Sequence, residues 1–456
     1  MSDALKITPF RHPLKGSLKL PGSKSITNRA LITAALSKGF VKLNGALFSR
    51  DTSIMIEALE ALGFELTCDQ AQGIIQIQGL SGTIPEKKAS LNVGNAGTAA
   101  RFITAFLALQ EGGEYFLDGD PQMRARPMKG LLDALKELGA AEFIFAEKEG
   151  HFPFKMITKG YCLNKASVDA SSSSQILSAL LLCLPAAKQD TTLRCANVRD
   201  AYIKVTEKIK AGFGAIPIVH KTPNKYLIKS ELYEGPEGNS YSIEPDLSAA
   251  SYFLALTLIH GGDLSIDNIG EAPIQGDAAF SNILNLHGLE VLPHKTHWSV
   301  KGPLELAQKK DPLELDFTLF SDTFLTYAAI APIISTRVII KGIGHTRHQE
   351  TDRIAAMAKE LKKLGQGVTE TEDSLGIVGD RQALKERAQA ALASGSLLKI
   401  ETYEDHRFAM SFGILGTYDL LGDGSPWLSI KGADCCNKTF PEFFNTLAQL
   451  KHASHP

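Results

Sequence analysis

The sequence lacks an excess of either charge. Its 456 residues include 48 Lys and Arg against 50 Asp and Glu, which gives a formal net charge of −2 at pH 7. Proteins that bind nucleic acid or an anionic membrane over a broad surface usually carry a clear excess of positive charge. We therefore expect neither partner, and a site for a small anion has to be built from a local cluster of Lys and Arg.

Cysteine motifs and long apolar segments are also missing. The six cysteines are scattered, and none forms a C-x-x-C motif: Cys68, Cys162, Cys183, Cys195, Cys435 and Cys436. This spacing indicates no disulfide framework and no zinc site, so we predict no metal and a reducing cytoplasm. The longest apolar stretch, 176–187, is shorter than the roughly 20 residues of a membrane-spanning helix. Residues 1–16 lack the apolar core of a signal peptide, so we expect a cytoplasmic protein.

An internal repeat sets the organisation of the chain. The length of 456 residues exceeds one ordinary hydrophobic core, so two domains are expected. Five predicted amphipathic helices each end in a glycine, and these glycines are spaced 74 to 77 residues apart: Gly63, Gly139, Gly214, Gly288 and Gly365. A sixth helix, 443–450, is followed by Lys451 instead. Glycine at this place is typical of the left-handed residue that ends a helix.

A second pattern occurs in the same repeats. Small or polar residues lead into an apolar segment six times, at 25–36, 95–109, 171–184, 246–259, 320–334 and 404–416. Helices that are apolar nearly all round are predicted to be buried. Short alternating runs between them, such as 73–79 and 297–302, predict strands. The sequence therefore predicts an α/β protein of six similar units, three per domain, with buried helices inside sheets.

The starts of the predicted buried helices are candidate anion sites. Each start presents backbone N–H groups and the positive end of a helix dipole, so six starts directed at one cleft would bind a polyanion. The alternative is that the small residues there only permit close packing or cap the helix. Polar residues and one glycine gather at these starts: Lys24, Asn28, Arg29, Asn95, Gly97, Thr98, Arg101, Ser173, Ser174, Gln175, Asp322, Asp405, His406 and Arg407. Arginine beside an apolar helix is costly unless it is paired, so the set favours a small polyanionic substrate.

Motifs for nucleotides are absent. Gly22-Ser23-Lys24-Ser25 is not a P-loop, which requires G-x-x-x-x-G-K-[ST]. Gly94 and Gly97 in GNAGTAAR let backbone N–H groups approach an anion closely. They do not form the G-x-G-x-x-G fingerprint, so we predict no nicotinamide or flavin cofactor.

Residues 348–353, HQETDR, leave two interpretations open. Glu350, Asp352 and Arg353 lie within one predicted helical turn, at the start of the helix that ends at Gly365. Thr351 or Asp352 could cap that helix. Alternatively, one carboxylate transfers protons beside an anion-binding arginine.

Taken together, the motifs resemble those of the EPSP synthase family of enolpyruvyl transferases. The matching stretches, in order along nearly the whole chain, are LPGSKSITNRAL, GNAGTAAR, RARPM, SSSSQ, FSDTFLTYAA, RHQETDR, YEDHRFAM and NKTFPEF. The resemblance implies two domains of three βαβαββ units each, an inside-out α/β barrel fold. We place one domain at 22–244, binding much of one substrate, and the other at 1–21 plus 245–456, containing the acid–base carboxylates. The active site is expected in the cleft between the domains, which closes to exclude water.

The resemblance also implies a reaction. Enzymes of this family transfer the enolpyruvyl group of phosphoenolpyruvate to the 5-hydroxyl of shikimate 3-phosphate and release phosphate. The addition–elimination passes through a tetrahedral intermediate and forms 5-enolpyruvylshikimate 3-phosphate in the shikimate pathway. No metal or organic cofactor takes part. We expect a monomer whose partners are these two substrates.

Carried over position by position, the resemblance implies a set of site residues. For shikimate 3-phosphate these are Lys24, Ser25, Arg29, Ser173, Ser174, Gln175, Tyr202, Asp322 and Gln349. For phosphoenolpyruvate they are Lys24, Asn95, Gly97, Arg126, Gln175, Arg353, Arg407 and Lys438. The implied catalytic residues are Asp322 for the 5-hydroxyl proton, Glu350 for the proton at C3, and Lys24. Lys24 and Lys438 would neutralise the departing phosphate.

Three positions depart from the family pattern. Gln349 replaces a lysine that is common there, and Arg199 replaces a serine near the phosphate of shikimate 3-phosphate. Phe102 follows Arg101 where a proline is common in glyphosate-sensitive members. Our hypothesis is that Phe102 shifts the helix that bears Gly97 and so alters glyphosate affinity, which a Phe102→Pro variant tests.

Three other functions fit the sequence less well. The related transferase acting on UDP-N-acetylglucosamine usually opens with a G-A-K-N type motif and uses a loop cysteine, and neither is present near Lys24 or Arg126. An RNA-end-processing cyclase on a related architecture would require a basic RNA face, which the charge balance does not support. A non-catalytic binder of shikimate phosphates would not need Asp322, Glu350 and Lys24, although Gln349 leaves this alternative open.

Overall fold

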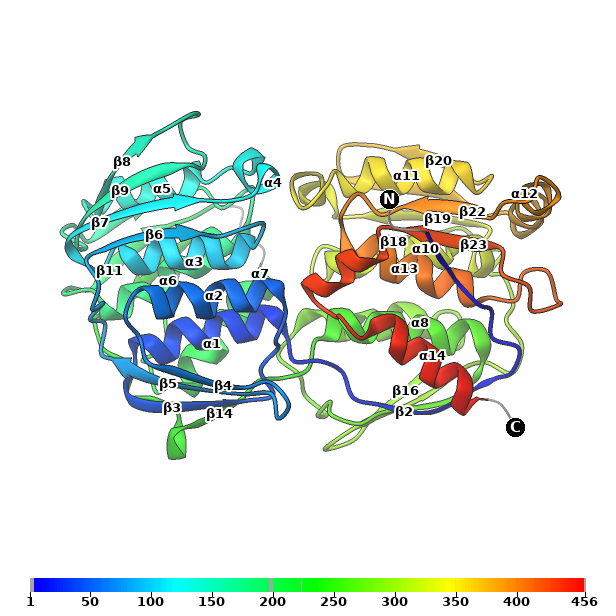
Figure 1. Ribbon diagram of the computed structural model, residues 1–456, viewed down its shortest axis with the longest axis horizontal. Coiled ribbons are helices and arrows are strands. Elements are labelled where there is room, and N and C mark those ends of the chain that lie inside the picture. Colours follow the sequence, from blue (N-terminus) through cyan, green and yellow to red (C-terminus); the bar gives the residue numbers. More distant parts are fainter. Residues whose placement is uncertain (1–3, 197–199, 223, 455–456) are drawn as a thin grey trace. The chain divides into compact units, whose positions relative to one another are not determined.

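The chain forms two compact units in the computed structural model, which describes residues 4–196, 200–222 and 224–454. Unit 1 comprises Met1–Pro21 and Pro245–Pro456, and unit 2 comprises Gly22–Glu244. Arg199, one of the three departures named above, lies outside the described residues. Each unit is built from sheets on the outside and helices on the inside (Figure 1).

Unit 2 contains three four-stranded sheets. Its strands are β3 (Lys38–Asn44), β4 (Leu66–Asp69), β5 (Ile74–Leu80), β6 (Lys88–Asn92), β7 (Glu111–Asp118), β8 (Ala141–Phe145), β9 (Phe154–Lys159), β10 (Lys165–Ser167), β11 (Thr191–Arg194), β12 (Val219–Thr222), β13 (Lys225–Ile228) and β14 (Ser240–Ser242). The sheet orders are β14-β3-β5-β4, β6-β7-β9-β8 and β10-β11-β13-β12. In each sheet the first two strands are parallel and the remaining pairs are antiparallel.

Three apolar helices fill the interior of unit 2. They are α1 (Lys24–Leu36), α3 (Gly97–Leu107) and α6 (Ser174–Cys183), and they pack against one another. The more amphipathic helices α2 (Arg50–Ala61), α5 (Lys129–Glu137) and α7 (Asp200–Gly212) lie beside them. The short segments are α4 (Pro121–Ala125), η1 (Leu184–Ala186) and η2 (Glu237–Asn239). Every residue of α3 is buried, as its all-round apolar sequence predicts.

Unit 1 repeats this design. Its strands are β1 (Leu5–Lys6), β2 (Leu14–Leu18), β15 (Gly262–Ile266), β16 (Glu290–Pro293), β17 (Trp298–Lys301), β18 (Leu313–Asp316), β19 (Arg337–Lys341), β20 (Gly367–Glu370), β21 (Ser374–Val378), β22 (Leu398–Glu401) and β23 (Leu428–Lys431). They form the sheets β16-β17-β15-β2, β18-β19-β21-β20 and β1-β23-β22. The buried helices are α8 (Leu247–His260), α10 (Phe324–Ile334) and α13 (His406–Thr417), which also contact one another.

The remaining segments of unit 1 lie around that core. The helices are α9 (Phe280–Asn285), α11 (Arg353–Lys363), α12 (Arg381–Ala393) and α14 (Phe443–Ala453). The short 3-10 helices are η3 (Gly276–Ala279), η4 (Ser321–Thr323), η5 (Gly344–His348) and η6 (Ala433–Lys438). Helix α12 lies between β21 and β22, outside the repeated βαβαββ order, and was not predicted. Among the described residues, no helix combines the length and the apolar character needed to cross a bilayer.

The predicted architecture of six α/β units is confirmed, with two corrections. Among the described residues, the order βαβαββ is continuous along the chain in three units, which begin at β6, β10 and β18. The first unit of each half takes its first strand from a distant segment, β14 in unit 2 and β2 in unit 1. The last unit has a three-stranded sheet, in which β1 from the start of the chain pairs with β23. A local sequence pattern does not show such pairings between distant strands.

The repeated glycines have the conformation that was predicted for them. Gly63, Gly139, Gly214, Gly288 and Gly365 all have positive φ, between 63° and 90°. A side chain is strained in this left-handed region, which explains the identity of these residues without a role in function. Helix α14 instead continues through Lys451 and ends at Ala453, so it needs no glycine there.

Candidate functional site

In unit 1 the predicted site residues gather around Arg353. This arginine is the first residue of α11, and its side chain is 2% exposed. The N-cap of α11 is Asp352, whose carboxylate accepts from the N–H of Ala355 at 3.0 Å. The capping interpretation is therefore right for Asp352, whereas Glu350 precedes the helix and its carboxylate is used elsewhere.

Arg353 joins three carboxylates. Its Nη1 donates to Asp322 Oδ1 at 2.9 Å, and its Nη2 donates to Glu350 Oε2 at 2.9 Å. Its Nε donates to Asp405 Oδ2 at 2.7 Å. Nη1 also donates to the side-chain oxygen of Gln349. The two carboxylates predicted to transfer protons are thus held by the two ends of one guanidinium group.

Two further cations complete this cluster. Arg407 Nη2 donates to Asp322 Oδ2 at 2.6 Å, and Lys438 Nζ donates to Glu350 Oε1 at 3.1 Å. The side chains of Arg407 and Lys438 are each 9% exposed, and those of Asp322 and Glu350 are 15% and 11% exposed. Three cations and three carboxylates therefore lie together with little access to water, where charge interactions are strong.

The electrostatics of the cluster follow from this arrangement. Burial by itself would lower the pKa of Arg353, but the charges of Asp405, Glu350 and Asp322 raise its pKa above the usual value. A fourth carboxyl group, Asp277 in η3, is buried and accepts from Ser248 Oγ at 2.7 Å. Burial and then the charge of Asp322 raise the pKa of Asp277 to about 7.

In unit 2 the start of α1 holds the first set of predicted residues. Lys24 Nζ forms an ion pair with Asp51 Oδ2 on α2 at 3.0 Å, and the Lys24 side chain is 17% exposed. Ser25 Oγ lies 3.4 Å from Ser23 Oγ. Arg29, one turn further along α1, points inward and is 1% exposed.

Arg29 is held by neutral groups. Its Nε donates to Thr206 Oγ1 at 2.9 Å, its Nη1 to the Ser25 carbonyl oxygen at 2.9 Å, and its Nη2 to Ser178 Oγ at 3.2 Å. Its guanidinium carbon lies 5.2 Å from the ring centroid of Phe102 and 5.8 Å from that of Tyr202. Burial, partly offset by Tyr202, lowers the pKa of Arg29 to about 10, so the group remains a cation at neutral pH.

The starts of α3 and α6 are joined by Gln175. Its Oε1 accepts from Arg101 Nη1 at 3.0 Å, and its Nε2 donates to Thr98 Oγ1 at 3.1 Å. Ser173 caps α6 through a bond from the N–H of Gln175 at 3.2 Å, and Ser174 is the first residue of that helix.

The guanidinium of Arg126 lies over Gly97. Its Nη1 donates to Asn95 Oδ1 at 3.4 Å, and a Cβ added to Gly97 would lie 2.6 Å from Arg126 Nη2. The glycine is therefore explained by the close approach of an arginine.

Of the two alternatives left open for the helix starts, capping applies to three of them. Side chains of Ser173, Asp246 and Asp405 cap α6, α8 and α13. In the described part of the chain, α1, α3 and α10 have no such side-chain cap. A cap occupies one or two of the four N–H groups that a ligand would otherwise meet at a helix start.

The predicted residues thus form two groups. Unit 1 brings together Asp322, Gln349, Glu350, Arg353, Arg407 and Lys438, and unit 2 carries Lys24, Ser25, Arg29, Asn95, Gly97, Arg126, Ser173, Ser174, Gln175 and Tyr202. Three groups were not among the predicted site residues: Asp51, Asp277 and the ring of Phe102 beside Arg29. An acid in the first turn of a helix is common, so Asp51 carried no distinctive signal. Within the described ranges, no three His, Cys, Asp or Glu side chains are placed to hold a metal ion.

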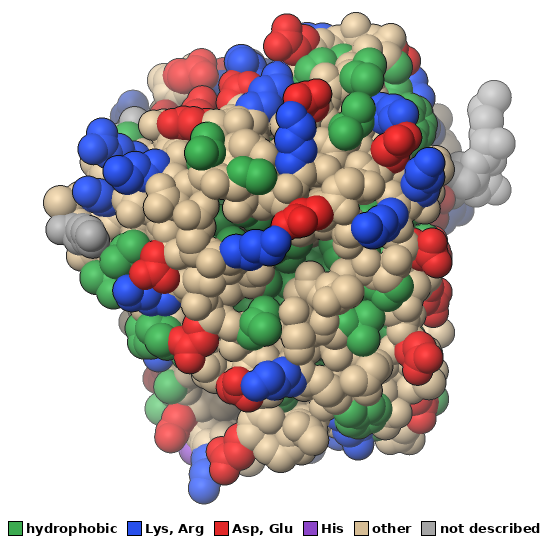
Figure 2. All heavy atoms as spheres, turned by 90° about the vertical axis from the view of Figure 1, so that its left-hand side faces the viewer, with side chains coloured by type: hydrophobic (Ala, Val, Ile, Leu, Met, Phe, Trp, Pro, Cys, Tyr) green, Lys and Arg blue, Asp and Glu red, His purple; other side chains and the backbone are tan. Residues whose placement is uncertain are grey.

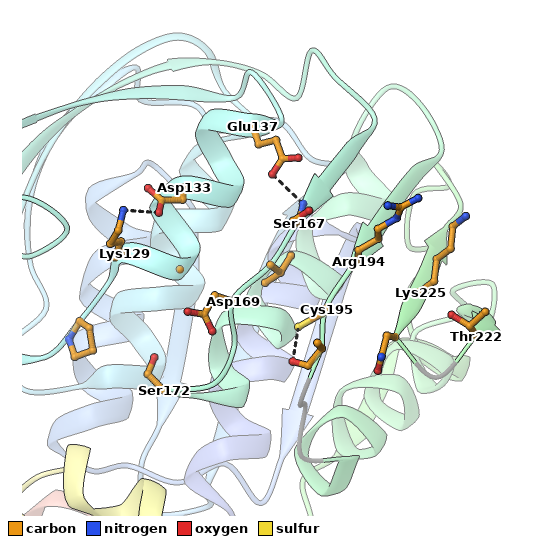
Figure 3. A pocket seen from close by; sticks show the side chains of 15 residues that line it. Lys129, Asp133, Glu137, Ser167, Asp169, Ser172, Arg194, Cys195, Thr222 and Lys225 are labelled. Atoms are coloured by element: carbon orange, nitrogen blue, oxygen red, sulfur yellow. Dashed lines mark hydrogen bonds and ion pairs between the residues drawn. The ribbon is translucent and has the colours of Figure 1, made fainter.

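An open pocket of about 990 Å³ elsewhere in unit 2 does not contain the predicted site residues. It lies beside α5 and the strands β10, β11 and β13, and its walls carry both signs of charge (Figure 3). Lys129 is paired with Asp133 at 2.7 Å, and Glu137 accepts from the N–H of Ser167. Mixed, partly paired charges give little preference for an anion. The face of unit 2 in Figure 2 likewise shows Lys and Arg interspersed with Asp and Glu.

Comparison with known proteins places the chain among its relatives. A family model described as EPSP synthase (3-phosphoshikimate 1-carboxyvinyltransferase) matches residues 10–447. A 3-phosphoshikimate 1-carboxyvinyltransferase of Opitutus terrae is 43% identical over 460 residues, covering 100% of this chain and 99% of that protein. Its counterpart in Nostoc punctiforme is 37% identical over 451 residues, covering 98% of this chain and 99% of that protein.

Solved structures confirm the fold. EPSP synthase from Acinetobacter baumannii superposes with a TM-score of 0.76 at 24% identity, covering 98% of this chain and 97% of that one. The enolpyruvyl transferase NikO from Streptomyces tendae gives a TM-score of 0.70 at 15% identity, with the same coverage. Similarity at these identities establishes the architecture alone, whereas the full-length relatives establish the family. The chain belongs to the EPSP synthase (3-phosphoshikimate 1-carboxyvinyltransferase) family.

Proposed function

We propose that this protein transfers the enolpyruvyl group of phosphoenolpyruvate to the 5-hydroxyl of shikimate 3-phosphate, forming 5-enolpyruvylshikimate 3-phosphate and releasing phosphate. Family membership over the whole chain supports this activity. The observation that carries it is the buried cluster in unit 1, where Arg353 binds both Asp322 and Glu350. Addition and elimination of an enolpyruvyl group requires two proton-transfer groups beside cations that bind anions, and this cluster supplies both.

The cations of unit 1 suit the charges of phosphoenolpyruvate. Arg353 and Arg407 have planar guanidinium groups that can bind carboxylate or phosphate oxygens with two parallel hydrogen bonds. Lys438 offers a compact charge, which suits the departing phosphate. In the structure these three groups are paired with Asp322, Glu350 and Asp405. A bound anion would compete with those carboxylates for the same N–H donors.

The same competition suggests how the two carboxylates become active. Asp322 accepts from Arg353 and Arg407, and Glu350 accepts from Arg353 and Lys438. A carboxylate between two cations is a weak base, because the cations favour its charged form. Anions of the substrate that take over those donors would raise the proton affinity of both carboxylates. We assign Asp322 to the proton of the 5-hydroxyl and Glu350 to the proton at C3.

Unit 2 supplies the groups we assign to shikimate 3-phosphate. They are the cations Lys24 and Arg29 and the neutral donors Ser25, Ser173, Ser174, Gln175 and Tyr202. Lys24, paired here with Asp51, is also assigned to phosphoenolpyruvate and to catalysis. Asn95, Gly97 and Arg126 complete the phosphoenolpyruvate set, and the contact of Arg126 with Asn95 supports their grouping.

Gln349 fits this scheme as a neutral residue. Its side-chain oxygen accepts from Arg353, and a lysine at the same place would instead put two cations side by side. We therefore propose that Gln349 orients Arg353 in addition to contacting shikimate 3-phosphate. The six cysteines are free thiols, which supports a reducing compartment such as the cytoplasm. Light scattering of the purified protein will test the expected monomer.

The experiment that tests the function is a phosphate-release assay. Purified protein is mixed with phosphoenolpyruvate and shikimate 3-phosphate, and UDP-N-acetylglucosamine replaces the second substrate in a parallel reaction. We expect release with shikimate 3-phosphate alone. Release only with UDP-N-acetylglucosamine would assign the chain to the related transferase, and binding without release would support a non-catalytic binder.

Variants test the two carboxylates. Asp322→Ala and Glu350→Ala should each lower kcat by about 100-fold or more, the usual contribution of a general acid or base. Binding of shikimate 3-phosphate, measured by calorimetry, should change much less. Glu386→Ala, which removes an exposed carboxylate on α12, is the matched control and should keep the wild-type rate. Loss of binding with full turnover of the remaining complex would contradict the proton-transfer roles.

A further inference from the structure

Arg29 is a buried cation whose hydrogen-bond partners in the described part of the chain are all neutral. Among the residues whose side chains the structure describes, none is an acidic partner of Arg29. A guanidinium has five N–H donors. Three of those of Arg29 donate to Thr206, Ser25 and Ser178, and the described residues offer no acceptor to the other two. Burying an unpaired charge is expensive, so other groups must offset the lost hydration.

Two aromatic rings supply that compensation. The guanidinium carbon lies 5.2 Å from the Phe102 ring centroid on α3 and 5.8 Å from the Tyr202 ring centroid on α7. The electron-rich face of an aromatic ring attracts a cation within about 6 Å. A ring stabilises the cation without neutralising it and without occupying its N–H donors, which lie in the guanidinium plane. A carboxylate at the same place would remove both the charge and the donors that an anionic ligand needs.

We propose that Phe102 is a positioning residue that holds the guanidinium of Arg29 ready for an anionic group of shikimate 3-phosphate. The proposal rests on the proposed function and deepens it, because it explains why a phenylalanine stands at this position. Phe102 is fully buried, and its backbone belongs to the interior helix α3, so the ring has a fixed place from which to contact Arg29 on α1. Phe102 acts through Arg29 and needs no contact with the substrate.

The proposal differs measurably from an effect through the position of α3. Gly97 starts that helix, and Arg126 lies against it. If Phe102 acted by shifting α3, its replacement would alter binding of phosphoenolpyruvate, to which Gly97 and Arg126 are assigned. If Phe102 acts through Arg29, its replacement alters binding of shikimate 3-phosphate. The two ligands therefore separate the two explanations.

The test compares Phe102→Leu and Phe102→Met with Phe106→Leu. Phe106 lies one turn further along α3, is equally buried, and contacts the ring of Phe64 at 5.7 Å between centroids. Calorimetry gives the Kd for shikimate 3-phosphate, steady-state kinetics give both KM values and kcat, and urea unfolding reports stability. Two variants without a ring keep the test valid if one of them folds poorly.

We expect both Phe102 variants to raise the Kd for shikimate 3-phosphate by about 3- to 30-fold, the range of a cation–π contact. The KM for phosphoenolpyruvate should stay within about twofold of wild type. Phe106→Leu should lose similar stability and keep both affinities. An unchanged Kd in the Phe102 variants, an equal change for both substrates, or the same Kd change in Phe106→Leu would each overturn the proposal. Failure of the wild-type protein to bind or convert shikimate 3-phosphate would instead refute the proposed function.

Discussion

Replacing Asp405 by alanine should destabilise unit 1 far more than the loss of a helix cap does. Asp405 is fully buried, and its carboxylate both caps a helix and pairs with an arginine. It accepts from the N–H of Arg407, which caps α13 at 2.9 Å, and from Arg353 Nε at 2.7 Å and Nη2 at 3.3 Å. The variant leaves the Nε of a buried arginine without its partner.

The expected loss in the free energy of unfolding follows from the helix cap and the ion pair. Loss of an N-cap costs about 1 kcal/mol. Removing one partner of a buried ion pair costs about 3–5 kcal/mol, and the lower end applies because Arg353 keeps Asp322 and Glu350. The free energy of unfolding should therefore fall by about 4 kcal/mol. At an m-value of about 3 kcal/mol/M, the urea midpoint should fall by about 1.3 M.

The assay uses the two tryptophans of the chain. Trp298 and Trp427 both lie in unit 1 and are buried, so their fluorescence follows the unfolding of that unit. The matched control is Asp380→Ala, which removes the aspartate cap of α12 without touching an arginine. Its midpoint should fall by only about 0.3 M. Equal shifts for Asp405→Ala and Asp380→Ala would refute the reasoning, since the pair with Arg353 would then add nothing to the cap.

Two further predictions concern Asp277 and Gly97. The pKa of Asp277 is raised to about 7, whereas the pKa of an unfolded aspartate is about 3.9. The contribution of Asp277 to the stability of the folded state is therefore complete below about pH 4 and is lost as the pH rises to about 7. The free energy of unfolding of Asp277→Asn, taken relative to that of wild type, should therefore increase by about 2–3 kcal/mol from pH 5 to pH 8, as measured by urea unfolding. The same difference between variant and wild type at both pH values would contradict this. Gly97→Ala places a Cβ 2.6 Å from Arg126 Nη2 and 2.8 Å from Arg101 Nη1. Because the guanidinium groups of both arginines must then move, the KM for phosphoenolpyruvate should rise by about 2- to 10-fold. An unchanged KM would argue against a role of Arg126 in binding phosphoenolpyruvate.

The sequence was most informative where local chemistry decides the structure. Segments such as 97–107 are apolar on all sides, and such a helix is stable only in an interior. Gly63 and its four counterparts end helices in a conformation that other residues avoid. Charged residues at interior helix starts, such as Arg407 on α13, pointed correctly to a cluster of charges, because they are too costly to bury alone.

Other features depended on segments far apart in the chain. The strand that completes the first sheet of unit 2 is β14, which lies almost two hundred residues after β3. Likewise, β2 pairs with β15 across about 250 residues. Strands pair through backbone groups that nearly all residues share, so the sequence does not indicate which distant strand is the partner. The sequence left two alternatives open for the helix starts, because a polar residue before a helix can cap it as well as leave it open to a ligand; the structure shows a side-chain cap on α6, α8 and α13.

The sequence by itself determined the kinds of structure and the kinds of charge: six buried helices in an α/β framework, and a small set of arginines, lysines and carboxylates for an anionic substrate. Only the tertiary structure decided the partners. It joined Arg353 to Asp322, Glu350 and Asp405, and it placed Arg29 between Phe102 and Tyr202. The physical reason is one of range. Burial and helix-end conformation depend on neighbouring residues, whereas an ion pair or a ring contact depends on which distant helices pack together.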